Sequence, residues 1–69
     1  MSDPTYKLVE IVGTSTASLD AAIKNGVQRA GQTLRHLDWF QVSEIRGRVE
    51  NGEVKQYQVI MKVGMQLES

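Results

Sequence analysis

Residues 37–47 read LDWFQVSEIRG, and with the Asn51-Gly52 pair that follows they determine the fold that the sequence predicts. Side chains that alternate between two faces are typical of a β-strand. An Asn-Gly pair between two alternating runs indicates a β-hairpin closed by a type I′ turn. The sequence therefore predicts two long strands, residues 37–50 and 53–67, joined by a two-residue turn.

The two-residue turn also predicts which residues face each other across the hairpin. It places Trp39 opposite Gly64 and Arg46 opposite Tyr57, unless a bulge near Gly47 shifts the register. The better apolar face comprises Tyr57, Val59, Met61, Val63, Met65 and Leu67. The only tryptophan lies on the other face, among glutamines, and this placement is the main functional clue in the sequence.

The chain before the hairpin predicts one strand and one helix. Residues 5–13 form the expected strand, and residues 18–35 carry apolar side chains at the i, i+3, i+4 spacing of an amphipathic helix. A right-handed crossover makes the first two strands parallel, and the third fits between them, antiparallel to both. We therefore expect an α+β fold of the order β-α-β-β, with the helix on one face of a three-stranded sheet.

The predicted helix carries local signals at both ends and in its interior. Thr16 or Ser18 is expected to be the N-cap, because its side-chain oxygen can accept a hydrogen bond from a free backbone N–H. Gly26 falls on the buried stripe, where it would compensate its low helix propensity by a close approach to the sheet. His36 is expected to be a solvated cap at the C-terminal end, where a cation interacts favourably with the helix dipole.

Size and composition limit the class of protein. The 69 residues are expected to form one small domain, 1–69, whose own core is marginal. Small domains need disulfides, a metal or oligomerisation, and the sequence has no cysteine and one histidine. Disulfides and a structural zinc site are therefore not expected, and we predict a homo-oligomer.

Charge and hydropathy narrow the choice of partners. Eight basic and eight acidic residues give a formal net charge of zero, which argues against non-specific nucleic-acid binding. No apolar run approaches the roughly 20 residues of a membrane helix, and the N-terminus lacks the pattern of a signal peptide. We therefore expect a soluble, cytoplasmic protein with neither a nucleic acid nor a membrane as partner.

Trp39 has two interpretations. Its indole offers a face for stacking on a planar ligand, the neighbouring glutamines offer paired donors and acceptors, and Gly64 would leave open space beside the ring. Alternatively, Trp39 anchors a subunit interface, where tryptophan is enriched. Gln58 lies about 20 Å from Trp39 along the sheet, so one small ligand that contacts both residues requires two subunits.

Basic residues elsewhere could bind an anion. Arg46 has the planar fork that suits a phosphate, although it could instead be a surface arginine packed on Tyr57. A polar stripe on the helix could hold a second anionic ligand or be a plain solvated face. No nucleophile–base pair, carboxylate dyad or metal-ligand cluster is visible, so we do not expect an enzyme or a metal site. The stripe comprises Arg29, Gln32, Thr33 and His36.

Four segments of the chain resemble the bacterial dodecins, in order and with matching spacing over nearly the whole length. They are VEIVGTS at residues 9–15, LDWF at 37–40, EIRG at 44–47 and YQV at 57–59. The resemblance implies a β-α-β-β subunit whose sheet partly wraps the helix, and twelve such subunits in a hollow shell of cubic symmetry. It also implies storage and quenching of a flavin, without turnover, and FMN is the flavin that bacterial members favour.

The resemblance assigns a role to three residues. Trp39 would stack on the isoalloxazine ring between symmetry-related subunits, and Gln58 would hydrogen-bond the polar edge of that ring. Arg46 would neutralise or position the phosphate or the tail of the ligand. Riboflavin or FAD could take the place of FMN in such a site.

A second ligand has weaker support from the resemblance. Some bacterial members look able to bind coenzyme A on the outer surface, and here Arg29 and Thr33 would be the residues to hold it. Close relatives often carry phenylalanine and arginine where this chain has Met65 and Gln66, and loss of that arginine weakens the case for a second anionic ligand. A purely structural oligomer with Trp39 as a packing anchor, and a shell that binds coenzyme A or another nucleotide, are the alternative functions.

Overall fold

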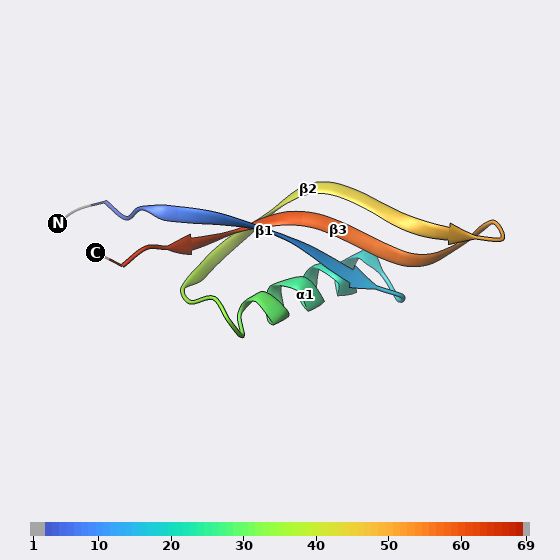
Figure 1. The fold of residues 1–69 in the computed structure, drawn as a ribbon, viewed down its shortest axis with the longest axis horizontal. Coiled ribbons are helices and arrows are strands. Elements are labelled where there is room, and N and C mark those ends of the chain that lie inside the picture. Colours follow the sequence, from blue (N-terminus) through green and yellow to red (C-terminus); the bar gives the residue numbers. More distant parts are fainter. Residues whose placement is uncertain (1–2, 69) are drawn as a thin grey trace.

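The computed structural model describes residues 3–68 as one helix and three strands (Figure 1). The elements are β1 (Tyr6–Ser15), α1 (Leu19–Ala30), β2 (Leu37–Glu50) and β3 (Glu53–Gln66). The strand β3 lies between β1 and β2 and pairs with both in antiparallel orientation. The predicted order β-α-β-β and the three-stranded antiparallel sheet with one helix are therefore confirmed.

The helix begins as predicted and ends earlier than predicted. Ser18 is the N-cap, and its side-chain oxygen accepts a hydrogen bond of 3.0 Å from the backbone N–H of Ala21. The predicted end at residue 35 is wrong, because α1 ends at Ala30 and Gly31 is its C-cap. A glycine inside a helix costs about 1 kcal/mol relative to alanine, and ending the helix before Gly31 avoids that cost.

His36 is not a helix cap, contrary to the prediction. It lies in the connection to β2, beyond the end of α1, and has a left-handed backbone conformation with φ of 60°. Its backbone oxygen accepts a hydrogen bond of 3.1 Å from the N–H of Gln66. Its Nε2 lies 2.9 Å from the carboxylate of Glu68. His36 therefore ties the entry of β2 to the end of β3.

Glycines allow the helix to approach the sheet closely, as predicted for Gly26. A Cβ added at Gly26 would lie 2.6 Å from the Met61 methyl carbon and 3.0 Å from the Gly13 Cα. A Cβ at Gly13 would collide with the backbone oxygen of Ala22. The core of the protomer lies at this contact, where Ala22, Val59 and Met61 have no exposed surface.

The hairpin of β2 and β3 closes with the predicted turn. Asn51 and Gly52 have positive φ angles of 52° and 77°, as a type I′ turn requires. The closed end of the hairpin projects beyond α1 (Figure 1). It exposes Val49 and Val54, which lie opposite each other. This end of the hairpin therefore has no cover from its own helix.

A β-bulge changes the register in the middle of β2, at a position that the sequence did not indicate. It falls between Val42 and Glu44. A second register shift lies between Arg48 and Val49, close to the bulge that the sequence allowed near Gly47, and between the two shifts Arg46 lies opposite Gln58. The predicted pairing of Arg46 with Tyr57 is therefore wrong. A bulge adds one residue to one strand and moves the following side chains to the other face. The arginine consequently lies on the face of the tryptophan and not on the helix face.

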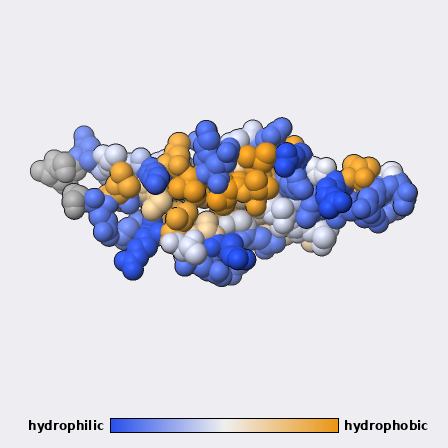
Figure 2. Space-filling view, viewed as in Figure 1, coloured by the Kyte–Doolittle hydropathy of each residue, from blue (hydrophilic) through white to orange (hydrophobic). Residues whose placement is uncertain are grey.

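The protomer is elongated and exposes much apolar surface. It measures 56 × 20 × 14 Å, and its radius of gyration of 14.3 Å exceeds the value of about 11 Å for a compact chain of this length. Apolar side chains gather over the middle of the molecule (Figure 2). Among residues 3–68, five hydrophobic residues are buried, and ten large ones are exposed: Leu8, Val12, Leu19, Trp39, Phe40, Val42, Ile45, Val49, Val54 and Leu67. Such a surface is suited to association with further protomers.

Candidate ligand-binding site

Trp39, near the start of β2, rests on the backbone of Gly64 in the neighbouring strand. A Cβ at Gly64 would lie 2.5 Å from Cζ2 and 2.7 Å from Cδ2 of the indole. Only a residue without a side chain therefore allows the ring to lie there. The prediction that Gly64 leaves open space beside the ring is wrong, because the indole itself fills that space. Trp39 nevertheless keeps 41% of its surface exposed.

Tyr6 of β1 contacts the indole from the side. The two rings meet edge to face, with centroids 4.7 Å apart and planes inclined by 62°, an arrangement that aromatic pairs prefer. The neighbouring Asp38 carboxylate raises the pKa of Tyr6, because it can accept a hydrogen bond only from the protonated phenol. Trp39 is thus held from below by a glycine and from the side by a tyrosine.

A second group of polar side chains lies further along the same face of the sheet. Nε of Arg46 donates a hydrogen bond of 2.6 Å to Oε1 of Gln58. Nε2 of Gln58 in turn donates a hydrogen bond of 2.9 Å to Oε1 of Gln56. Two of the three predicted site residues, Arg46 and Gln58, are therefore in direct contact. The alternative of an arginine packed on Tyr57 is wrong, because the bulge turns Arg46 to the opposite face.

The structure does not bring Trp39 and Gln58 together within one protomer. Trp39 faces Gly64, which lies six residues from Gln58 along β3. This spacing corresponds to about 20 Å of strand. A planar ligand of three fused rings that touches both side chains must therefore lie between two protomers.

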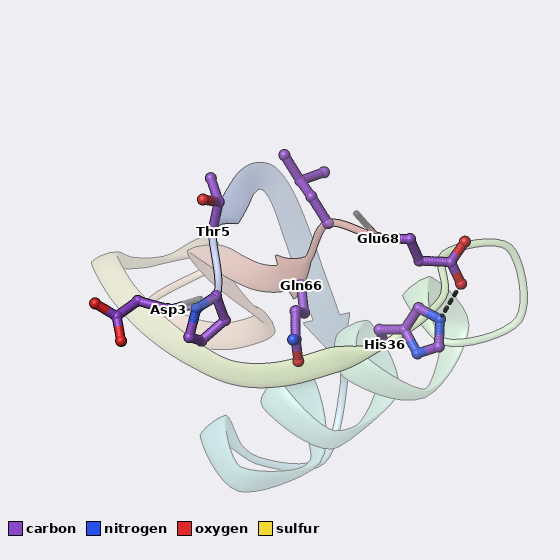
Figure 3. A pocket seen from close by; sticks show the side chains of 7 residues that line it. Asp3, Thr5, His36, Gln66 and Glu68 are labelled. Carbon is purple, nitrogen blue, oxygen red and sulfur yellow. Dashed lines mark hydrogen bonds and ion pairs between the residues drawn. The ribbon is translucent and has the colours of Figure 1, made fainter. Parts of the chain in front are cut away.

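Three residues of the polar stripe predicted on the helix line two separate depressions. Arg29 and Thr33 line one of about 340 Å³ between α1 and β1, whose other lining residues are apolar. His36 lines the other, an open depression of about 990 Å³, where it points toward Glu68 while Asp3 points away from both (Figure 3). This geometry adds no support for coenzyme A, which stays a prediction.

The side chains on the tryptophan face define the kind of site. They provide an aromatic surface and an amide held by a guanidinium group, which are groups for binding a planar, polar ligand. Within residues 3–68, no three His, Asp or Glu side chains are grouped so that they could hold a metal ion. In the same part of the chain, no helix combines the length and the apolar character that crossing a membrane requires.

Comparison with known proteins identifies the family of this binding protein. The family model of the dodecins matches residues 5–68. A dodecin of Thermus thermophilus is 57% identical over 63 residues, which is 91% of each chain. The solved dodecin of Streptomyces coelicolor has a TM-score of 0.93 and 51% identity, over 100% of this chain and 99% of that one. The dodecin of Streptomyces davaonensis has a TM-score of 0.92 and 50% identity, over 99% and 100%. The chain belongs to the dodecin family.

Membership of this family tests several of the predictions made from the sequence. The resemblance to dodecins is confirmed, and the chain is not an enzyme, because dodecins are small non-catalytic binding proteins. The family implies a homo-oligomer, which agrees with the exposed apolar surface of the protomer. Dodecins are known flavin binders, so a flavin is the first ligand to consider.

Proposed function

We propose that this protein binds a flavin, with FMN as the first candidate, and sequesters it in the cytoplasm by stacking it on Trp39. The observation that carries the proposal is the indole itself, supported by Gly64, flanked by Tyr6 and still 41% exposed. A ring held in this way offers a rigid, flat contact surface at little entropic cost. Riboflavin and FAD carry the same ring system and are the alternative ligands.

Gln58 and Arg46 would complete the site from a second protomer. After its contacts with Arg46 and Gln56, the amide of Gln58 keeps one acceptor position and one N–H for a ligand. The polar edge of a flavin ring offers donors and acceptors side by side, so it can pair with both. The guanidinium of Arg46 adds positive charge, which suits the phosphate or the tail of the ligand.

Stacking on an indole would explain storage and protection from light. Contact with the indole gives an excited flavin ring a fast non-radiative route to its ground state, so the bound ligand is quenched. A homo-dodecameric shell that places tryptophans of neighbouring subunits face to face would hold flavins in stacked pairs. The spacing of about 20 Å between Trp39 and Gln58 supports such a shared site, because a single protomer cannot supply both contacts.

A fluorescence titration of dilute FMN with the purified apoprotein tests the proposal. We expect strong quenching by the wild type and none by Trp39→Ala, because the variant lacks the stacking surface. Trp39→Phe keeps a smaller aromatic face and should retain part of the affinity. FMN that stays fluorescent at wild-type concentrations well above micromolar would contradict the proposal.

A purely structural oligomer is the competing function, and the ten exposed hydrophobic side chains favour it. In that case Trp39 anchors a subunit interface. Light scattering on the same variants separates the two functions. Our proposal requires Trp39→Ala to assemble like the wild type while losing flavin, whereas an anchoring role requires the variant to form smaller species.

A further inference from the structure

Arg46 and Gln58 form a contact whose chemistry goes beyond a phosphate-binding role for the arginine. The contact joins Nε of Arg46 to Oε1 of Gln58 at 2.6 Å, across the strand pair β2–β3. It exists because the bulge between Val42 and Glu44, together with a second register shift between Arg48 and Val49, brings Arg46 opposite Gln58. Without that bulge the alternation of β2 would turn the arginine to the helix face. The local irregularity of β2 therefore creates this pair.

The contact fixes which way the amide of Gln58 points. A glutamine amide has nearly the same shape in two flipped orientations, which exchange its acceptor oxygen and its donor nitrogen. A guanidinium group has donors and no acceptor, so Arg46 favours the orientation in which Oε1 faces it. Nε2 then faces Gln56, whose Oε1 accepts its hydrogen bond at 2.9 Å. Arg46 thus sets the direction of the whole chain of hydrogen bonds.

We propose that Arg46 is a positioning residue that acts through Gln58 and presents the amide in one orientation to the edge of the ligand ring. The inference rests on the proposed flavin binding. A ring edge carries its donors and acceptors in a fixed order, so a flipped amide would oppose donor to donor and acceptor to acceptor. Arg46 is therefore important for a flavin without a phosphate as well as for FMN.

Titrations with riboflavin and with FMN distinguish this role from a contact with the phosphate. We expect Arg46→Met to weaken riboflavin binding roughly threefold to tenfold, as for loss of one oriented hydrogen bond. FMN binding should weaken by at least as much, because its phosphate also loses a nearby positive charge. Arg48→Met is the matched control: it removes the same charge from the same strand, and Arg48 contacts Glu50 instead of Gln58. A variant Arg46→Met that loses affinity for FMN and binds riboflavin like the wild type would overturn the inference.

A double-mutant cycle with riboflavin tests whether the effect passes through Gln58. In a Gln58→Leu background, Arg46→Met should change the riboflavin affinity less than about twofold, because no amide remains to be oriented. The same loss in both backgrounds would show that Arg46 acts independently and would overturn the inference. Light scattering confirms the assembly of each variant before titration.

A second substitution keeps the test decisive if Arg46→Met does not assemble. Arg46→Gln retains a hydrogen-bonding side chain but offers both donor and acceptor, so it no longer selects one orientation of Gln58. We expect Arg46→Gln to lower the affinity for riboflavin by about the same factor as Arg46→Met. Unchanged riboflavin binding would overturn the inference. A wild type that quenches neither flavin would instead refute the proposed function, and this inference with it.

Discussion

Gly64 shows how strongly one missing side chain determines the candidate site. An alanine Cβ at this position would lie 2.5 Å from Cζ2 of Trp39, so the indole would have to leave its position. Apart from this contact, alanine is favoured over glycine in a strand by roughly 0.5–1 kcal/mol. We therefore expect Gly64→Ala to keep its β-structure in circular dichroism and to lose FMN affinity by about tenfold or more, equivalent to about 1.4 kcal/mol.

Gly31→Ala is the matched control for this substitution. An added Cβ would lie 3.4 Å from the backbone oxygen of Val27, and the residue caps α1 away from Trp39. We expect FMN quenching by this variant to equal that of the wild type. Equal quenching by Gly64→Ala as well would show that the position of the indole over the glycine does not matter for binding.

The residues of the site differ in how far the sequence could predict them. Trp39, Gln58 and Arg46 could be selected because indole, amide and guanidinium groups have distinctive binding chemistry. The position of the indole over Gly64 depends on side-chain torsions, which no alternation pattern specifies. Tyr6 was missed because its role depends on the pairing of β1 with β3, in which it lies opposite Gln66. That register, once inferred, would have placed it on the face of Trp39.

At the scale of secondary-structure elements, strong local signals were sufficient to predict the strands and the turn from the sequence. The register shift between Arg48 and Val49 lies close to the bulge that the sequence allowed near Gly47. The bulge between Val42 and Glu44 could not be predicted, because the small polar side chain of Ser43 suits either face and leaves the alternation looking unbroken. The end of the helix was predicted too late, because Leu34 continues the apolar spacing beyond Ala30. Hydrophobic periodicity records which side chains can be buried, and it does not record where backbone hydrogen bonding changes.

The contact between α1 and the sheet predicts different effects for its two glycines. At Gly13, an added Cβ meets the backbone oxygen of Ala22, so the helix must move away. At Gly26 the nearest atom is the flexible methyl end of Met61, at 2.6 Å, and alanine adds about 1 kcal/mol of helix propensity. We expect Gly13→Ala to lower the free energy of unfolding by about 3 kcal/mol and Gly26→Ala by about 1 kcal/mol or less.

Urea unfolding at one fixed protein concentration measures this difference, since the stability of an oligomer depends on concentration. Both variants add one methyl group to the same helix–sheet contact, so each is the control for the other. A variant Gly26→Ala that is as unstable as Gly13→Ala would show that movement of the flexible Met61 side chain does not relieve the clash with the added Cβ. The distance of 3.0 Å between the added Cβ at residue 26 and the Cα of Gly13 would then be the dominant constraint.

At the scale of the whole molecule, assembly and binding are expected to depend on each other. The protomer is 56 Å long and buries five hydrophobic residues among residues 3–68. Its proposed ligand contacts are about 20 Å apart along one sheet, so the complete site requires neighbouring copies. A ligand that binds only the assembled state stabilises that state by mass action, which makes the flavin a stabiliser of the oligomer.

Val12 of β1 tests how much the fold depends on assembly. It lies opposite Ile60, on the face away from the helix, and is 49% exposed in the protomer. If the protomer were stable alone, Val12→Glu would change the free energy of unfolding by no more than about 0.5 kcal/mol. If this face is covered in a symmetric assembly, Val12→Glu places a buried carboxylate without a partner in every subunit. We expect the second outcome, seen as loss of the assembly in light scattering and loss of ellipticity at the same concentration.

Gln28→Glu introduces the same side chain on the exposed surface of α1 and is the matched control. It should assemble like the wild type, because its carboxylate remains in water. A variant Val12→Glu that persists as a folded monomer would show that the small helix–sheet core is sufficient for folding. The exposed apolar face would then serve ligand binding alone. Loss of both assembly and structure would instead show that neighbouring copies supply the part of the core that 69 residues cannot provide.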